Sequence, residues 1–284
     1  MWDEKSHHYF LHHFPPIFFM NSKPLIKKYG RGRPIVTIVA CVHGDETCGL
    51  TVEKLLKENN LNNAVYFIIA NPPAIKAKRR FVESNLNRVF PGKLNGTIEE
   101  QLAYRISPIL KKSDFVLDIH SSSEHTPAFV ITTMDSEKHR KLANNLGVKK
   151  YVIMAKEVTN KKSLIDYVNQ NRGLGISVEC GQHKENKTQE NAITITKNFL
   201  NSINLLNGKT KNSKLTIYRI EGSLKVPSSD FVPVKLKNFR LVRAKQLLGK
   251  GRNYEMRATK DFYPLLFSSR LIDNKICLIG RKLN

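Results

Sequence analysis

Short apolar runs rich in β-branched residues alternate along this chain with longer segments of helical period, and this alternation constrains the fold most. The runs predict strands at residues 35–42, 64–70, 115–119, 129–133, 151–155 and 175–179. The intervening periodicity predicts helices at residues 50–57, 97–111, 136–146 and 188–206. Because strands that are apolar on both faces alternate with helices, we expect an α/β fold. Its sheet should be mixed but largely parallel, and flanked by helices on both faces.

The pattern changes after Gly208, where a polar linker is followed by short strand-like pieces separated by Gly, Pro and Ser. A chain of 284 residues is long enough for one large α/β domain with a small appendage. We therefore predict a flexible N-terminal extension at residues 1–20, an α/β domain at 21–208 and a β-rich C-terminal subdomain at 209–284.

The chain is strongly basic, with a formal net charge of +23. Residues 205–284 hold 18 basic and 5 acidic residues, so this stretch alone contributes +13. A positive surface attracts anions, whether small carboxylates or nucleic acid. A solvated, lysine-rich surface without a partner explains the same charge, and both interpretations stay open at this point.

Cysteine spacing and hydropathy indicate in which cellular compartment the protein is expected. The four cysteines form no CxxC pair and are too sparse for a secreted disulfide framework. No apolar run approaches the roughly 18 residues of a membrane span. A signal peptide is not expected, because Asp3 and Glu4 precede the apolar N-terminal stretch. The sequence thus predicts a cytoplasmic protein with reduced thiols and no membrane partner.

Three of the predicted strands end in residues that bind metals or transfer protons. His43 and Glu46 follow the first strand, His120 ends the third, and Glu179 ends a later one. The carboxyl ends of strands in an open α/β sheet form the usual ligand crevice. Two histidines and a glutamate are a typical ligand set for catalytic zinc, which keeps a further position open. Each residue alone is more often structural, but their coincidence predicts a metal site at His43, Glu46 and His120.

Two further acidic residues have candidate roles beside this metal. Asp118 shares a strand face with His120, so its carboxylate is placed to orient that ligand imidazole. Glu179 is a candidate general base for a water molecule that attacks a carbonyl. A buried structural aspartate and a helix-capping glutamate are the respective alternatives.

The segment at residues 71–92, directly after the second strand, concentrates arginine and asparagine. Arg79, Arg80 and Arg88 lie in it together with Asn85 and Asn87. Guanidinium groups bind carboxylates in a bidentate manner and stabilise oxyanions. The segment has too few aromatic residues to form a stacking platform for nucleic acid.

Five motifs stand in one order along the chain: HGDET at 43–47, NPPA at 71–74, KRRF with NLNR and FPG at 78–92, LDIHSS at 117–122 and VECG at 178–181. Together they resemble the succinylglutamate desuccinylase and aspartoacylase family, a branch of the zinc carboxypeptidase fold. The resemblance implies one Zn²⁺ per chain, held by His43, Glu46 and His120. It also implies a β-rich C-terminal domain that covers the cleft.

The same resemblance implies roles for the remaining site residues. Glu179 would act as general base and then as acid, Arg80 would polarise the scissile carbonyl, and Asn87 with Arg88 would hold a substrate carboxylate. Tyr263 is a candidate substrate-pocket tyrosine, although an aromatic residue in a β-rich segment more often packs in the core.

The chain departs from the family pattern at two positions. Asn85 replaces the usual aspartate, which removes a negative charge that we expect near Arg88. Asp45 replaces the usual asparagine and adds a negative charge beside the metal.

The expected activity is hydrolysis of the amide bond of a small, anionic N-acyl amino acid. A zinc carboxypeptidase acting on peptides is one alternative, distinguished by an open cleft. A non-enzymatic protein that binds anions or nucleic acid is the other, although no P-loop or RNA-binding motif supports it. Whether the chain forms a homo-oligomer is left open.

Overall fold

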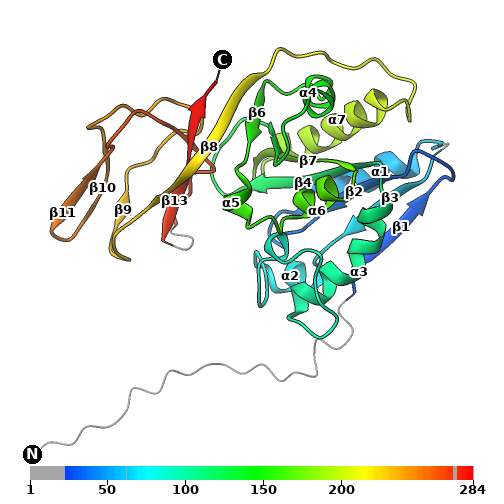
Figure 1. Cartoon of the computed structure of the whole chain (residues 1–284), viewed down its shortest axis with the longest axis horizontal. Coiled ribbons are helices and arrows are strands. Elements are labelled where there is room, and N and C mark those ends of the chain that lie inside the picture. The colour runs from blue at the N-terminus through cyan, green and yellow to red at the C-terminus, as the bar shows by residue number, and fades with distance from the viewer. Residues whose placement is uncertain (1–22, 62, 271–273, 284) are drawn as a thin grey trace, which may run out of the picture.

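The computed structural model describes residues 23–61, 63–270 and 274–283, and a ten-stranded sheet crosses these residues (Figure 1). Its order is β1-β3-β2-β4-β7-β5-β6-β8-β13-β12. The first seven strands along the chain are β1 (Leu25–Tyr29), β2 (Val36–Ala40), β3 (Val65–Ile69), β4 (Phe115–Ser122), β5 (Phe129–Thr132), β6 (Lys150–Ile153) and β7 (Leu174–Gln182). Strands β3, β2, β4 and β7 are mutually parallel, whereas β5 runs antiparallel to β7. The predicted mixed, largely parallel sheet is confirmed.

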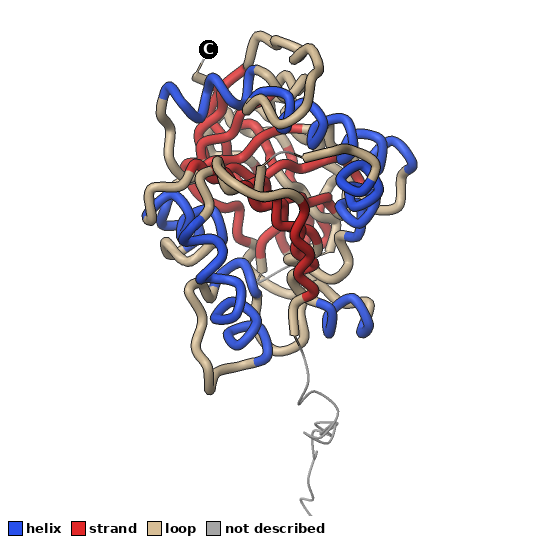
Figure 2. The backbone as a smooth tube through the Cα atoms, turned by 90° about the vertical axis from the view of Figure 1, so that its right-hand side faces the viewer, coloured by secondary structure: helices blue, strands red, loops and turns tan. Residues whose placement is uncertain are grey.

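Helices cover both faces of this sheet, as the turned view in Figure 2 shows. The α-helices are α1 (Val52–Lys57), α2 (Pro72–Ala77), α3 (Ile98–Lys112), α4 (Glu137–Asn144), α5 (Lys156–Thr159), α6 (Leu164–Gln170) and α7 (Asn186–Ser202). Two short 3-10 helices are η2 (Thr47–Thr51) and η3 (Leu86–Arg88). One apolar cluster joins the sheet to α1, α4 and α7, and a second joins it to α3 and α6.

Alternation along the central strands explains these two clusters. In β2, Ile38 belongs to the cluster under α1 and α7, while its neighbour Val39 belongs to the cluster under α3. Both side chains are fully buried. Because successive side chains point to opposite faces, a strand with buried apolar side chains on both faces needs helices on both sides.

The chain after residue 208 is rich in strands, as predicted. The strands are β8 (Thr216–Lys225), β9 (Val232–Pro233), β10 (Leu247–Gly251), β11 (Tyr254–Arg257), β12 (Tyr263–Leu265) and β13 (Lys275–Lys282). A second, three-stranded sheet has the order β11-β10-β9, and a third apolar cluster lies under it. Strand β8 pairs with β6 on one side and with β13 on the other, so the large sheet continues from the α/β part into the C-terminal part. Because one sheet runs through both parts, the domain boundary at residue 208 stays a prediction.

The C-terminal part contacts the loop that follows β4. The Asn238 side-chain amide donates to the carbonyl oxygen of His125 at 3.0 Å. Lys235 lies 3.9 Å from the Glu124 carboxylate. Since β4 also carries His120, this contact brings the C-terminal part close to the chain that leaves the candidate metal site.

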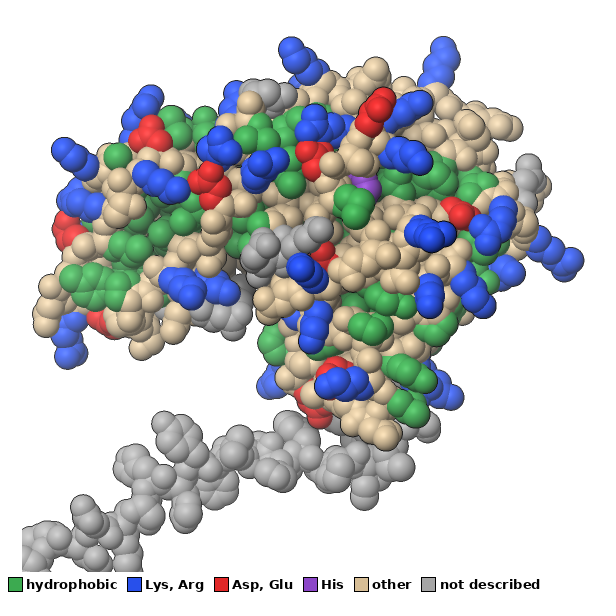
Figure 3. Space-filling model, in the orientation of Figure 1, with side chains coloured by type: hydrophobic (Ala, Val, Ile, Leu, Met, Phe, Trp, Pro, Cys, Tyr) green, Lys and Arg blue, Asp and Glu red, His purple; other side chains and the backbone are tan. Residues whose placement is uncertain are grey.

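On the face shown in Figure 3, Lys and Arg side chains are spread over both the α/β part and the C-terminal part, rather than gathered over one of them. Within the described ranges, no helix is long and apolar enough to cross a membrane. All four cysteines are unpaired and buried. The predicted N-terminal extension lies outside the described residues.

Candidate metal centre and active site

The loop after β2 carries the first two candidate ligands. His43 and Glu46 are joined by a tight turn, in which the Glu46 amide donates to the His43 carbonyl at 3.2 Å. Gly44 lies between them, and a Cβ atom there would come within 2.2 Å of the Ala74 backbone. Glycine is thus needed because α2 packs directly against the loop, rather than for the conformational freedom of the turn.

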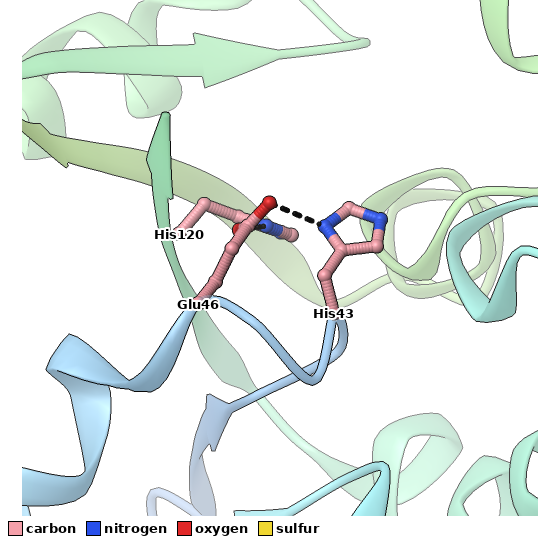
Figure 4. A group of neighbouring side chains, drawn as sticks. All are labelled: His43, Glu46 and His120. Carbon is pink, nitrogen blue, oxygen red and sulfur yellow. Dashed lines mark hydrogen bonds and ion pairs between the residues drawn. The ribbon is translucent and has the colours of Figure 1, made fainter. Parts of the chain in front are cut away.

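His43, Glu46 and His120 meet at the carboxyl ends of β2 and β4 (Figure 4). The Nδ1 atom of His43 lies 2.8 Å from Glu46 Oε1, and that of His120 lies 2.7 Å from Glu46 Oε2. All three side chains are at most 4% exposed, and one ligand atom from each lies within 4.8 Å of the others. Two imidazole nitrogens and a carboxylate oxygen around one point fit the donor set of catalytic zinc.

A buried carboxylate orients the His120 ring from behind. Asp118 is fully buried, and its Oδ2 lies 2.7 Å from His120 Nε2. The Ser177 hydroxyl, on the neighbouring strand β7, donates to the same oxygen at 2.9 Å. A metal-ligating histidine commonly gives its second ring N–H to a carboxylate, which fixes the tautomer and leaves the other nitrogen for the metal. Sequence analysis did not identify Ser177, because a buried serine in a strand has no distinctive spacing.

Asn85 acts on the other histidine ligand. Its Oδ1 lies 3.2 Å from His43 Nε2 and also accepts a hydrogen bond from the Asn87 amide at 2.9 Å. We expected the change from aspartate to alter the surroundings of Arg88, whereas the contact seen in the structure is with His43. The neutral amide oxygen therefore supports His43 where a carboxylate would do so with a negative charge.

Arg80 reaches the site from the loop after α2. Its guanidinium Nη1 donates to Glu46 Oε1 at 2.7 Å, and its side chain is 35% exposed. A partly accessible guanidinium beside the candidate metal ligands is placed to stabilise a developing oxyanion.

Glu99, which sequence analysis missed, holds the arginine-rich loop in place. Its buried carboxylate accepts hydrogen bonds from the amides of Val82, Glu83 and Ser84, and from the Asn71 side chain. Sequence analysis assigned this stretch to the start of α3, because Thr97 and Glu100 form the predicted capping box. Glu99 lies between these two residues and received no role of its own.

Asn87 and Arg88 lie on η3, beside the start of α6. Asn87 Oδ1 accepts a hydrogen bond from the Leu164 amide at 2.9 Å, and Arg88 Nη1 donates to the Asn87 carbonyl at 2.6 Å. The Asn87 oxygen is thus occupied by the protein, and the side-chain NH₂ group is the part of Asn87 that can donate a further hydrogen bond.

Glu179 is brought beside His120 by strand register, since the two residues are partners in the β4–β7 ladder. Its side chain is 6% exposed, and its Oε2 has no hydrogen-bond partner among the residues that the structure describes. Burial, with the Glu46 carboxylate nearby, raises the pKa of Glu179 from 4.5 to about 8, although His120 and Arg80 act in the opposite direction. A buried carboxyl group with a raised pKa is a candidate proton acceptor and donor.

Without a metal, His43 favours the neutral form of its imidazole and His120 favours the protonated form. Burial and the Arg80 guanidinium lower the pKa of His43 to about 4. Burial also opposes protonation of His120, but Asp118 and Glu46 outweigh it and raise its pKa well above the usual value. Because both imidazoles contact Glu46, the pKa of this carboxyl is well below its usual range despite its burial. A bound dication would replace the proton that the carboxylates hold on His120.

Tyr263 lies in β12, where its ring packs against the ring of Tyr218 at 5.4 Å between centroids. It is half-buried against the apolar cluster that also holds Phe239. This packing matches the core alternative considered for Tyr263, and its role in a substrate pocket stays a prediction.

A family model supports the assignment of this geometry. Residues 33–206 match the succinylglutamate desuccinylase/aspartoacylase catalytic domain. The chain belongs to this family. The match spans the loop of His43 and Glu46, strand β4 with His120, and strand β7 with Glu179.

Individual relatives are similar over shorter stretches. A succinylglutamate desuccinylase of Shewanella woodyi is 35% identical over 127 residues, which cover 41% of this chain and 36% of that protein. An N-alpha-acetyl-L-2,4-diaminobutyric acid deacetylase of Halomonas elongata is 30% identical over 203 residues, covering 65% and 58%. The chain thus spans less than two thirds of the length of either relative.

Solved structures show the same fold at lower identity. A succinylglutamate desuccinylase/aspartoacylase from Rhodobacter sphaeroides superposes with a TM-score of 0.76 at 17% identity, covering 92% of this chain and 88% of that one. Murine aminoacylase 3 superposes with a TM-score of 0.72 at 18% identity, covering 89% and 97%. Both similarities extend over the C-terminal β-rich part as well as the α/β domain.

Proposed function

We propose that this chain is a zinc-dependent amidohydrolase that removes the acyl group from an N-acyl amino acid. The observation that supports this most is the buried trio of His43, Glu46 and His120, with the unpartnered carboxyl of Glu179 on the adjacent strand. Named relatives of the family act on N-acyl amino acids, among them the N-acyl-aromatic-L-amino acid amidohydrolase of Rattus norvegicus.

The donor set fits zinc. Two buried histidines and one glutamate converge, and Asp118 supports His120 from the side away from Glu46. When bound, zinc supplies Lewis acidity for the carbonyl group and lowers the pKa of a water molecule. Its positive charge would also lower the pKa of Glu179 from about 8 toward neutrality, where a carboxyl group can both accept and donate a proton.

The chain's own residues then have distinct tasks. Glu179 takes a proton from the attacking water and returns it to the leaving amine. Arg80 stabilises the negative charge that develops on the carbonyl oxygen, because its guanidinium already lies at the edge of the site. Arg88 and the Asn87 NH₂ group hold a carboxylate of the substrate.

The first experiment measures zinc by elemental analysis in the wild type and in His120→Ala, after both are purified with zinc supplied. We expect about one zinc per chain in the wild type and strong loss in the variant. The wild type should also release the amine from N-acyl amino acids, and Glu179→Gln should lower kcat by about 10²–10⁴ with little change in zinc content. A wild type without zinc, or zinc-loaded protein that cleaves no N-acyl amino acid, would refute the proposal.

A further inference from the structure

A second group of metal-ligating side chains lies next to the candidate zinc ligands and has no role so far. It consists of Asp45, Glu46 and His183, and one ligand atom from each lies within 4.8 Å of the others. Glu46 also belongs to the first trio, whereas Asp45 and His183 do not. Asp45 stands in the turn after β2, and His183 directly follows β7. Two carboxylates and an imidazole are donors that divalent transition metals accept.

A cavity of about 170 Å³ lies beside this group. Asp45 and His183 line it, together with Ser121 and Lys184. A water molecule takes up about 30 Å³ in the liquid, so the cavity has room for a cation and several water molecules. Such waters would complete the coordination of a metal that receives only three donors from the protein.

Ser121 connects His183 to Glu46. The Ser121 amide donates to Glu46 Oε2 at 3.2 Å, and the Ser121 hydroxyl lies 2.8 Å from His183 Nδ1. When the imidazole donates to this hydroxyl, its other ring nitrogen keeps the lone pair that a cation needs. Asp118 and His120 show the same arrangement, in which a neighbouring oxygen fixes the ring of a ligand.

The Asp45 carboxylate has no counter-charge on the described part of the chain. No Lys, Arg or His side chain of these residues lies within ion-pair distance of it, whereas Glu46 beside it is paired with Arg80. Asp45 therefore stands next to a second carboxylate instead of a cation. Asp45 is exposed, so water screens part of the repulsion between the two groups. A divalent cation between them would replace this repulsion by attraction.

We propose that Asp45, Glu46 and His183 form a second divalent-cation site, which shares the Glu46 carboxylate with the proposed catalytic zinc. The inference goes beyond the proposed function, which needs only one metal. A carboxylate has two oxygens and can contact two cations at once. The second cation binds more weakly, because two dications repel each other and the Lys184 ammonium group lines the same cavity. It therefore binds when zinc is abundant and leaves on dialysis.

Calorimetric titration of the chelator-treated, full-length chain with zinc tests the inference. We expect one tight binding event and one weaker event. Asp45→Asn and His183→Gln should each weaken the second event at least about tenfold, because loss of an outer partner of a ligand already costs about 10–100-fold. Both should leave the first event nearly unchanged. Lys184→Met removes a positive charge from the cavity and should strengthen the second event.

Glu185→Gln is the matched control, because Glu185 lines the same cavity but belongs to neither group of ligands. It should leave both events nearly unchanged. A weaker event that keeps its affinity in Asp45→Asn and in His183→Gln would place the extra zinc elsewhere, for example on the histidines at positions 7, 8, 12 and 13. That result, or the absence of a second event in the wild type, would overturn the inference and leave the proposed function intact.

His120→Ala separates the inference from the proposed function. This variant should lose the tight event and retain the weaker one, because His120 does not belong to the second group. Zinc binding that is kept in full by His120→Ala but lost in Asp45→Asn would support the second site and contradict the proposed catalytic zinc.

Discussion

Replacing Glu179 by glutamine in the metal-free protein tests how strongly the site opposes ionisation of this carboxyl group. Burial raises the pKa of Glu179 from 4.5 to about 8 in the folded state. The unfolded chain releases the same proton near pH 4.5. Between these two values the folded state binds more protons than the unfolded state, so stability must fall as the pH rises through this window.

The size of the effect follows from the width of the window. Each pH unit is worth about 1.4 kcal/mol, so this one group lowers the free energy of unfolding by roughly 3–4 kcal/mol between pH 5 and pH 8. Glutamine has no proton to lose. We therefore expect Glu179→Gln to gain roughly this amount of stability over the wild type across the same interval.

Urea unfolding of chelator-treated protein, followed by circular dichroism at several pH values, measures the difference. Glu58→Gln is the control, because Glu58 is exposed and its substitution should change stability by no more than about 0.5 kcal/mol at any pH. Zinc should flatten the wild-type slope, since a nearby dication lowers the pKa of the carboxyl group. Parallel pH profiles for the wild type and Glu179→Gln would show that the buried carboxyl does not hold its proton, and the reasoning would fail.

Three further substitutions test the parts of the site separately. Asp118→Asn should weaken zinc binding about 10–100-fold, because His120 loses its carboxylate partner; competition with a chelator measures this, and Asp261→Asn on the exposed surface should have no effect. Arg80→Ala should lower kcat about 10²–10³-fold with a smaller change in KM, as expected when an oxyanion partner is removed; a change confined to KM would contradict this. Arg88→Ala should raise KM sharply for a carboxylate-bearing substrate, and steady-state kinetics with unchanged KM would exclude its proposed role.

The ligand trio is the part of the site that the sequence indicated best. His43 with Glu46 and His120 each follow a largely apolar run, and parallel strands place their carboxyl ends at one edge. The apolar pattern thus indicated that each residue stands at the end of its own strand. The rule that parallel strands end at the same edge then predicted that the three side chains meet.

Other features depended on packing between distant segments. Strand β1 has mostly exposed side chains and no apolar alternation, and it forms because the free edge of β3 offers backbone partners. Likewise, nothing local to Asn85 indicates that its side chain reaches His43, which is 42 residues away. The periodicity of apolar residues does not predict such contacts, because loops can hold the same two elements at many different distances from each other.

The sequence by itself determined the class of sheet, the helices α1, α3, α4 and α7 that cover it, and the strand ends where the chemistry gathers, because burial on one face imposes a period on these elements. Only the tertiary structure decided which groups meet there. Glu99 became the anchor of the arginine-rich loop, Ser177 the support of Asp118, and Asn85 the partner of His43. The physical reason is that hydrogen bonds between side chains depend on distances of a few ångströms, which are fixed only when separate elements pack together.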